Sequence, residues 1–213
     1  MALNYDQEIY NLAIQEGFSP IASKLIVAQA RYESANYGSN VFNNNNNMYG
    51  MKFIGQDKQP FATRGTLAPL NERSNSCKNG GTCVDRDFYA KYNKPSDSAK
   101  DVIQRLYKKT RNGIGFNELK DVKDAQEFAN KLKTRNYFGF HDINTSEGQK
   151  EANGYALGLN ARLLMVNVIN FYNENKKSIN YTMLGLGIIL ISITTYYYFK
   201  KNRNPYIRCK YHY

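Results

Sequence analysis

The feature that most constrains the fold is a strongly patterned helix that ends at a carboxylate. Ser19 followed by Pro20 is a typical helix start, because serine caps the first backbone N–H groups and proline fits the first turn. Apolar side chains then recur at helical spacing, at Ile21, Leu25, Ala28 and Tyr32. The pattern predicts a packed helix with Glu33 in its last turn, followed by a polar, asparagine-rich segment.

Helical spacing returns in the second half of the chain. We expect one helix from about Ser96, another from about Val122 and a third over about 155–169. Residues 53–87 instead contain glycines, prolines and a cysteine pair, which favours loops and short strands. The sequence therefore predicts one mainly helical domain over residues 1–175, with loops and short strands over 53–87.

An uncharged run of nineteen residues, YTMLGLGIILISITTYYYF, occupies residues 181–199. This length suits a bilayer-spanning helix, and tyrosines followed by KKNR are typical of a membrane interface. We therefore expect a linker at 176–180, a single C-terminal transmembrane helix at 181–199 and a basic tail at 200–213. No signal peptide is expected, because MALNYDQEIY has neither a basic leader nor an apolar core.

Charge and histidine content narrow the possible functions. The net charge of +11 favours a polyanionic neighbour, but five of the positive charges follow residue 199 and no nucleic-acid-binding motif is present, so we expect no nucleic-acid partner. The two histidines, His141 and His212, make a Ser-His-Asp triad improbable and exclude an HExxH metal site. We expect carboxylate chemistry, with no metal and no cofactor.

The three cysteines are a close pair, Cys77 and Cys83, and Cys209 in the tail. The segment CKNGGTC places a turn signal, Asn79–Gly81, between the pair, which could fold a hairpin and bring the two sulfurs together. A disulfide is expected in an oxidising compartment, and two unpaired thiols on a hairpin are the alternative.

The residues around Glu33 carry a family resemblance. The helix end AQARYES, the YGS that follows and the turn NMYGMK resemble the glucosaminidase family of peptidoglycan hydrolases, which includes phage lysins. The matching positions are Gln29, Glu33, Ser34, Gly38, Ser39, Asn47, Tyr49, Gly50 and Lys52. Later segments continue the resemblance in order, from DFYAKY to GYALGL, so that it covers about residues 5–172.

The resemblance implies a lysozyme-like α+β fold and hydrolysis of the β-1,4 bond that follows N-acetylglucosamine in peptidoglycan. Glu33 would be the general acid, which requires a carboxyl group held protonated by burial. Asn47 would begin a turn that walls the groove below Glu33, and Tyr49 of that turn would contact substrate. The remaining asparagines, 43–46, are expected to be loop filler from a biased composition.

The family also has a second carboxylate in its β-containing lobe. Glu72 is the favoured residue here, Asp85 is the alternative, and Asp57 ranks third. Alternatively, Glu72 is an ordinary solvated charge on a loop without a catalytic role. The separation of the two carboxylates, which the sequence does not provide, would decide between inversion and retention at the anomeric carbon.

Three tyrosines are expected to contact the sugar through stacking and hydroxyl hydrogen bonds. Tyr137 matches a tyrosine of the family near the cleft, Tyr155 matches one on the following helix, and Tyr37 stands where the family often has tryptophan. This chain departs from the family at Phe138 and Gly139, where alanine and threonine are common, and Tyr155 could instead belong to the core.

The expected partner is peptidoglycan at the bacterial cell wall, with membrane attachment through 181–199. Delivery by a phage particle, with other virion proteins as partners, is one hypothesis, and a bacterial tail-anchored autolysin is the alternative. Two further function classes stay open. A lytic transglycosylase on the same fold would leave anhydro ends, and a non-catalytic wall-binding or virion structural protein would bind without cleavage.

Overall fold

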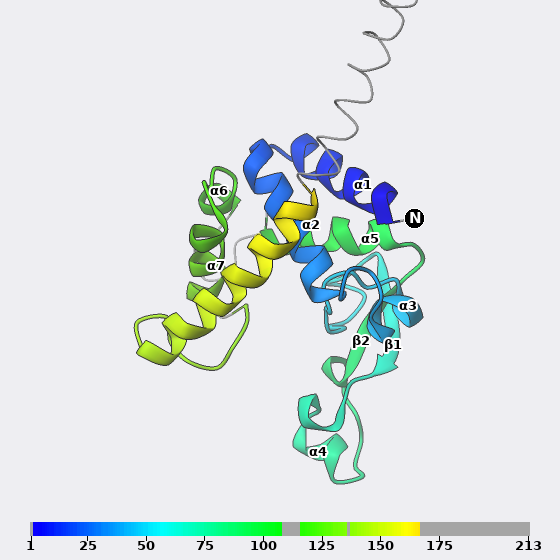
Figure 1. Cartoon of the computed structure of the whole chain (residues 1–213). Coiled ribbons are helices and arrows are strands. Elements are labelled where there is room, and N and C mark those ends of the chain that lie inside the picture. The colour runs from blue at the N-terminus through cyan, green and yellow to red at the C-terminus, as the bar shows by residue number, and fades with distance from the viewer. Residues whose placement is uncertain (1, 108–115, 136, 167–213) are drawn as a thin grey trace, which may run out of the picture. The chain divides into compact units, whose positions relative to one another are not determined.

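The computed structural model describes residues 2–107, 116–135 and 137–166. These residues all belong to one compact unit, Met1–Asn167. Within this unit the described chain is mainly helical and contains one small two-stranded sheet (Figure 1). The mainly α character and the small β-containing lobe fit a lysozyme-like fold, as the resemblance implies.

Helix α2, Pro20–Glu33, begins and ends where the sequence predicts. The Ser19 hydroxyl accepts a hydrogen bond from the Ala22 N–H at 3.2 Å, and Pro20 lies in the first turn. The capping satisfies one of the N–H groups that have no partner inside the helix. The start of α2 is therefore determined locally.

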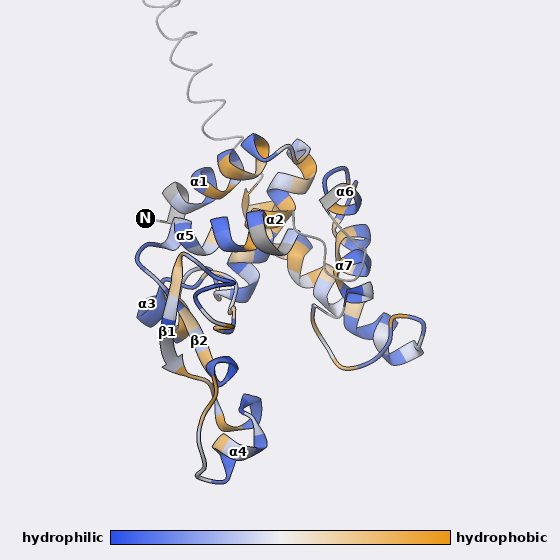
Figure 2. Ribbon diagram, turned by 180° about the vertical axis from the view of Figure 1, so that it is seen from behind, coloured by the Kyte–Doolittle hydropathy of each residue, from blue (hydrophilic) through white to orange (hydrophobic). Residues whose placement is uncertain are grey.

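The buried surface of α2 is wider than the predicted apolar face. Ile21 is 48% exposed, whereas Ile26 and Val27, which lie outside the predicted face, are fully buried. The reason is that α2 packs against both α1, Ala2–Gln15, and α7, Ala125–Thr134. Figure 2 shows hydrophobic residues along α1 and α2, whereas the asparagine-rich α3 is largely hydrophilic.

The predicted helices of the second half are present in the described residues. The elements are α5 (Pro95–Lys100), a π-helix η3 (Asp101–Tyr107), α6 (Phe116–Leu119), α7 and a helix over residues 146–166. The apolar face of α7 packs in the core, because its residues Ala125, Phe128, Ala129 and Leu132 are almost completely buried. Asp124 caps this helix by accepting from the Glu127 N–H at 2.8 Å.

The small lobe has its own core. Strands β1 (Ala62–Leu67) and β2 (Phe88–Tyr92) pair antiparallel, and Lys52 forms a further bridge to Tyr89. We call residues 51–92 the β-lobe. It also contains the 3-10 helices η1 (Leu70–Glu72) and η2 (Asp85–Asp87) and the short helix α4 (Asn75–Lys78). A separate buried cluster consists of Phe53, Ala62, Ala90 and Tyr92.

The cysteine pair of the β-lobe forms a disulfide. Cys77 and Cys83 are bonded, with their Cα atoms 4.5 Å apart. The expected hairpin is not formed, because Cys77 belongs to α4 and residues 79–81 form the turn after this helix. Gly80 has a φ of +80°, so the turn that brings the sulfurs together uses a left-handed residue.

Consecutive amides join helix α3, Asn40–Asn45, to the sheet. Asn45 donates to the Thr66 hydroxyl at 2.7 Å and accepts from the Thr66 N–H at 3.0 Å. Asn46, in the left-handed region, donates to the carbonyl at the end of β2 at 2.9 Å. The expectation that this part of the run is loop filler is therefore wrong for Asn45 and Asn46, whose amides attach α3 to both strands.

The fold class needs one correction. No helix of the described residues is both long and apolar enough to cross a bilayer. The predicted transmembrane helix over 181–199 is therefore not part of the fold described here, and residues 181–199 lie outside the described residues, as do the linker at 176–180 and the tail at 200–213.

Candidate active site

Glu33 ends α2 as a half-buried carboxyl group with one hydroxyl partner. The Tyr155 hydroxyl donates to Glu33 Oε1 at 2.6 Å. Burial raises the pKa of Glu33, and the hydrogen bond from Tyr155 opposes the rise without cancelling it. A carboxyl group that keeps its proton at a higher pH than an exposed glutamate is suited to general acid catalysis.

The Tyr155 hydroxyl is itself held by a buried chain of hydrogen bonds. The Tyr107 hydroxyl donates to Gln29 Oε1, and Gln29 Nε2 donates to the Tyr155 oxygen at 3.1 Å. Gln29 lies one helical turn before Glu33, so that both side chains leave the same face of α2. Tyr107 and Gln29 were not among the predicted site residues, although Gln29 belongs to the sequence motif that includes Glu33.

The ring of Tyr155 is packed inside the helical core. It stacks on Phe138 at 4.1 Å between centroids and 9° between planes, and it meets the edge of Tyr32 at 5.1 Å. A Cβ on Gly158 would lie 2.2 Å from the Tyr32 ring, so glycine lets the helix over 146–166 approach α2 closely. Tyr155 is 6% exposed, and its role as a sugar contact stays a prediction.

Tyr137 lies on the loop between α7 and the last described helix. Burial raises its pKa, and the negative charge of Glu33 adds to the rise, which places Tyr137 within the electrostatic range of that carboxyl group. The loop is fastened by Glu151, which pairs with the buried Lys133 and hydrogen-bonds His141 Nδ1 at 2.8 Å. Tyr155 thus contacts Glu33 directly, and Tyr137 is affected by its charge.

Tyr37 follows α2 in a strained turn and points away from solvent. Ala35, Asn36 and Tyr37 have φ values of 50°, 57° and 65°, a left-handed conformation that is unfavourable for residues other than glycine. Tyr37 is 8% exposed, and its hydroxyl donates to Asp6 Oδ1 at 2.7 Å. Asp6 also pairs with the buried Arg31 at 2.6 Å. The expected contact of Tyr37 with the substrate stays a prediction.

Asn47 and Tyr49 support the turn after the asparagine run. Asn47 is fully buried and donates to the carbonyls of Met51 and Ala90 at 2.8 and 2.9 Å. Tyr49 is 3% exposed, and its hydroxyl donates to the Ile26 carbonyl of α2 at 3.4 Å. The turn is therefore tied to the sheet on one side and to α2 on the other.

Glu72 lies at the end of η1 in the β-lobe, as an anion with two partners. Lys52 Nζ is 2.7 Å from Glu72 Oε2, and the Tyr89 hydroxyl donates to the same oxygen at 3.0 Å. Partial burial raises the pKa of Glu72, but Lys52 and Tyr89 together outweigh this effect and lower the pKa below its ordinary value. The surroundings therefore shift the pKa values of the two carboxyl groups in opposite directions, downward for Glu72 and upward for Glu33.

The two alternative carboxylates have simpler surroundings. Asp85 is paired with Arg64 on β1, and both side chains are exposed to solvent. Asp57 is exposed and lies beside Gly55, where an added Cβ would be 2.6 Å from Asp57 Oδ1. Of the three candidate carboxylates, only Glu72 has both a lysine and a tyrosine hydroxyl on one oxygen.

One group of potential metal ligands occurs among the described residues, at Cys77, Cys83 and Asp87. Its two sulfurs are bonded to each other. The Asp87 carboxylate is already occupied, because it accepts hydrogen bonds from the N–H and hydroxyl of Ser74 and from the Val84 N–H. These residues therefore do not fit a metal site.

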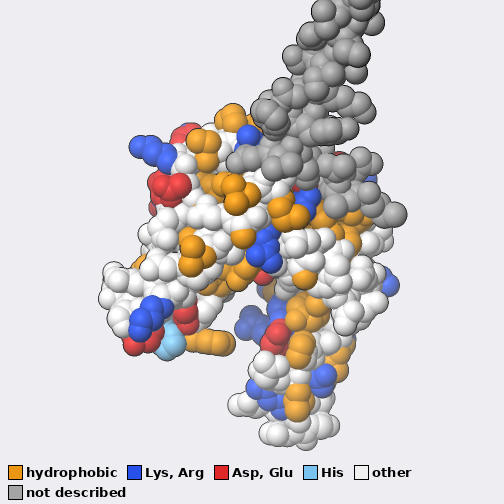
Figure 3. Space-filling model, viewed as in Figure 1, with side chains coloured by type: hydrophobic (Ala, Val, Ile, Leu, Met, Phe, Trp, Pro, Cys, Tyr) orange, Lys and Arg blue, Asp and Glu red, His pale blue; other side chains and the backbone are white. Residues whose placement is uncertain are grey.

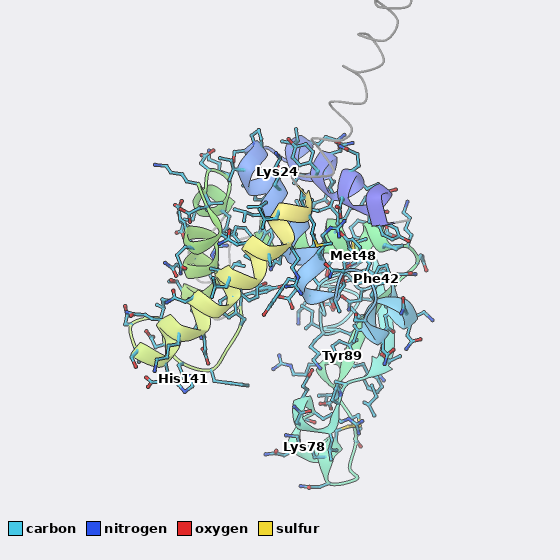
Figure 4. All side chains as sticks on the ribbon, in the orientation of Figure 1. Lys24, Phe42, Met48, Lys78, Tyr89 and His141 are labelled. Carbon is cyan, nitrogen blue, oxygen red and sulfur yellow. A yellow bond between two sulfur atoms is a disulfide. The ribbon has the colours of Figure 1, made fainter. Side chains whose placement is uncertain are left out.

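The surface of the described unit is hollowed between the β-lobe and the loop that carries the described histidine (Figure 3). Acidic and basic side chains gather on the β-lobe side of the hollow. Figure 4 places Tyr89 at the base of the β-lobe, Lys78 near its tip and His141 on the other side of the hollow. The hollow therefore separates the β-lobe from the loop that carries His141.

Comparison with known protein families gives a match over most of the chain. The glucosaminidase family, described as mannosyl-glycoprotein endo-beta-N-acetylglucosaminidase, matches residues 8–198. No curated protein and no solved structure matches the chain. The family match covers most of the chain and includes Glu33, its hydrogen-bond partners and Glu72. The chain therefore belongs to the glucosaminidase family of peptidoglycan hydrolases, and it is a glycoside hydrolase.

Proposed function

We propose that this hydrolase is an endo-β-N-acetylglucosaminidase, which cleaves the β-1,4 bond after N-acetylglucosamine in peptidoglycan glycan strands. One observation carries the proposal. Glu33 is a half-buried carboxyl group with a raised pKa, and one of its two oxygens accepts a hydrogen bond from Tyr155. In a family of glycoside hydrolases, this is the arrangement that a general acid needs.

The hydrogen bond from Tyr155 assigns different tasks to the two oxygens of Glu33. Oε1 accepts the tyrosine proton, so Oε2 is the oxygen that carries the acidic proton and delivers it to the leaving glycosidic oxygen. Once the proton has left, Glu33 is an anion in a half-buried site. The Tyr155 hydroxyl then donates to a charged acceptor, and such bonds are stronger than neutral ones.

Glu72 is assigned the complementary anionic role. Its lowered pKa keeps it ionised, and an ionised carboxylate can stabilise the positive charge that develops at the anomeric carbon or take a proton from the attacking water. Lys52 and Tyr89 leave one oxygen of Glu72 without a described partner, because both contact Oε2.

The decisive experiment is digestion of purified peptidoglycan by the full chain, with mass spectrometry of the released fragments. Fragments with N-acetylglucosamine at the reducing end are expected. Glu33→Gln should abolish their release, whereas Glu8→Gln, at an exposed position on α1, should not change it. Anhydromuramic ends would instead identify a lytic transglycosylase, and intact glycan from the wild-type chain would indicate a non-catalytic binding protein.

A second comparison tests the anionic carboxylate. Glu72→Gln should lower kcat/KM by about 100-fold or more, because the amide cannot carry the negative charge. Asp85→Asn is the matched control in the same lobe, and it should retain most of the activity. If the two variants show the reverse pattern, Asp85 is the second carboxylate and Glu72 is a structural ion-pair partner of Lys52.

A further inference from the structure

We propose that Gln29 and Tyr107 are positioning residues for the general acid. In this proposal, the chain of hydrogen bonds Tyr107–Gln29–Tyr155–Glu33 directs the Tyr155 hydroxyl to Glu33 Oε1 and so determines which oxygen of Glu33 holds the acidic proton. The proposal rests on the function proposed above, because it assigns roles to residues that act through Glu33.

The directions of the hydrogen bonds agree with the number of protons that each group has to donate. A tyrosine hydroxyl has one proton, and the Tyr107 proton is donated to Gln29 Oε1. The amide of Gln29 is therefore oriented with its NH2 group toward Tyr155, to which it donates at 3.1 Å. The Tyr155 oxygen thus receives a proton from Gln29, and its own proton is free to be donated to Glu33.

The opposite orientation of the Gln29 amide would change the outcome at Glu33. With its oxygen facing Tyr155, the amide would compete with Glu33 for the single proton of the Tyr155 hydroxyl. The Tyr107 hydroxyl disfavours this orientation, because its proton would lose the amide oxygen as acceptor. Removal of the Tyr107 hydroxyl therefore frees the amide to rotate, although no atom of Tyr107 contacts Glu33 through a described hydrogen bond.

Burial makes each hydrogen bond of the Tyr107–Gln29–Tyr155–Glu33 chain difficult to replace. Gln29 and Tyr107 are fully buried, and Tyr155 is 6% exposed. In such a site water does not readily replace a missing partner, and hydrogen bonds in a chain polarise one another. The three residues come from three separate elements, α2, the π-helix η3 and the helix over 146–166. Tyr107 is the last residue of η3, and π-helical turns are frequent at functional sites.

Among the described residues, the groups whose pKa is raised by the charge of Glu33 are all tyrosines. Tyr155 contacts it directly, and the charge of Glu33 also raises the pKa of Tyr137, Tyr107 and Tyr49. All four are neutral across the pH range in which a glutamate titrates, since their pKa values are raised above that of an exposed tyrosine. A change in the pH profile that follows loss of one hydroxyl therefore reports on hydrogen bonding to Glu33 rather than on a second titration.

The test is the pH dependence of kcat/KM for Tyr107→Phe in the full chain, with soluble peptidoglycan fragments as substrate. The variant keeps the ring and removes the hydroxyl. We expect kcat to fall about three- to tenfold with KM unchanged, because the weakened bond stabilises Glu33 mainly after proton transfer. Loss of that bond also raises the pKa of Glu33, so the alkaline limb of the profile should move up by about half a pH unit.

Two further variants separate positioning from simple stabilisation of the core. Gln29→Met removes both hydrogen bonds of the amide and should give the same shift, and the double variant should be no worse than the more severe single one, since both act on one chain. Tyr92→Phe is the matched control. It removes another buried hydroxyl, which donates to Asp101 at 2.7 Å, and it should lower stability without moving the pH profile.

The outcomes distinguish this inference from the proposed function. An active wild-type chain, an inactive Glu33→Gln variant and an unchanged pH profile in Tyr107→Phe would overturn the positioning role and leave the function standing. A Tyr92→Phe profile shifted as far as that of Tyr107→Phe would also overturn it, because the shift would then follow from general loosening. A wild-type chain that does not cleave glycan would refute the proposed function itself.

Discussion

Replacement of Asp6 is expected to be among the most destabilising single changes in the described part of the chain. Asp6 on α1 accepts hydrogen bonds from Arg31 Nε and Nη2, the shortest of 2.6 Å, and from the Tyr37 hydroxyl at 2.7 Å. Asp6 and Arg31 are 4% and 3% exposed. The carboxylate therefore joins α1, α2 and the left-handed turn after Glu33 in one place.

The magnitude follows from what Asp6→Leu leaves behind. Arg31 would stay buried without its counter-ion, and removal of one partner of a buried ion pair costs about 3–5 kcal/mol. For a domain of this size, each kcal/mol lowers Tm by roughly 2–4 °C, so the expected fall is about 10 °C. Asp6→Leu combined with Arg31→Met removes both charges, and we expect it to recover about 2 kcal/mol relative to the single variant.

The assay is equilibrium unfolding in urea, followed by far-UV circular dichroism on the full chain, with Tm from calorimetry. Glu8→Leu, on the same helix but exposed, is the matched control and should change the free energy of unfolding by less than about 0.5 kcal/mol. A cost below about 1 kcal/mol for Asp6→Leu would refute the reasoning, as would a double variant as unstable as the sum of the single ones.

Three other changes probe the site directly. Tyr155→Phe keeps the stacked ring but removes the hydrogen bond that stabilises ionised Glu33. The pKa of Glu33 should therefore rise, and the alkaline limb of the kcat/KM profile should move up by about one pH unit. A downward shift would contradict the assignment. Lys52→Met removes a group that lowers the pKa of Glu72. The acidic limb of the kcat/KM profile reports loss of the Glu72 charge, so it should move to higher pH in the same assay. Gly158→Ala places a Cβ 2.2 Å from the facing ring on α2; it should lower Tm by several degrees and reduce activity, and a wild-type Tm would show that the helices can separate freely.

The helices could be predicted from the sequence because their signals are local. Ser19 and Asp124 cap neighbouring N–H groups, and the apolar face of α7 repeats within ten residues. The resemblance likewise placed Glu33 at a helix end, where the structure has it. These features require no knowledge of what packs against them.

The hydrogen-bond chain at Glu33 could not be predicted in the same way. Gln29, Tyr107 and Tyr155 are far apart in sequence and meet only because three elements pack together. The position of Tyr37 in the motif likewise does not report that three left-handed residues turn its hydroxyl toward Asp6, and its substrate contact stays a prediction. Long-range packing decides such cases, and local spacing does not report it.

The asparagine run has a consequence for how the distance between Glu33 and Glu72 can change over generations. The β-lobe has its own small core, and Asn45, Asn46 and Asn47 attach it to the neighbouring turn by individual amide hydrogen bonds. None of the three amides belongs to the apolar cluster of the lobe, so a substitution there removes hydrogen bonds that hold the lobe in place rather than apolar contacts inside it. We therefore expect substitutions among these amides to change the spacing of the two carboxylates through the position of the β-lobe, while the apolar core of the helical body keeps its own contacts.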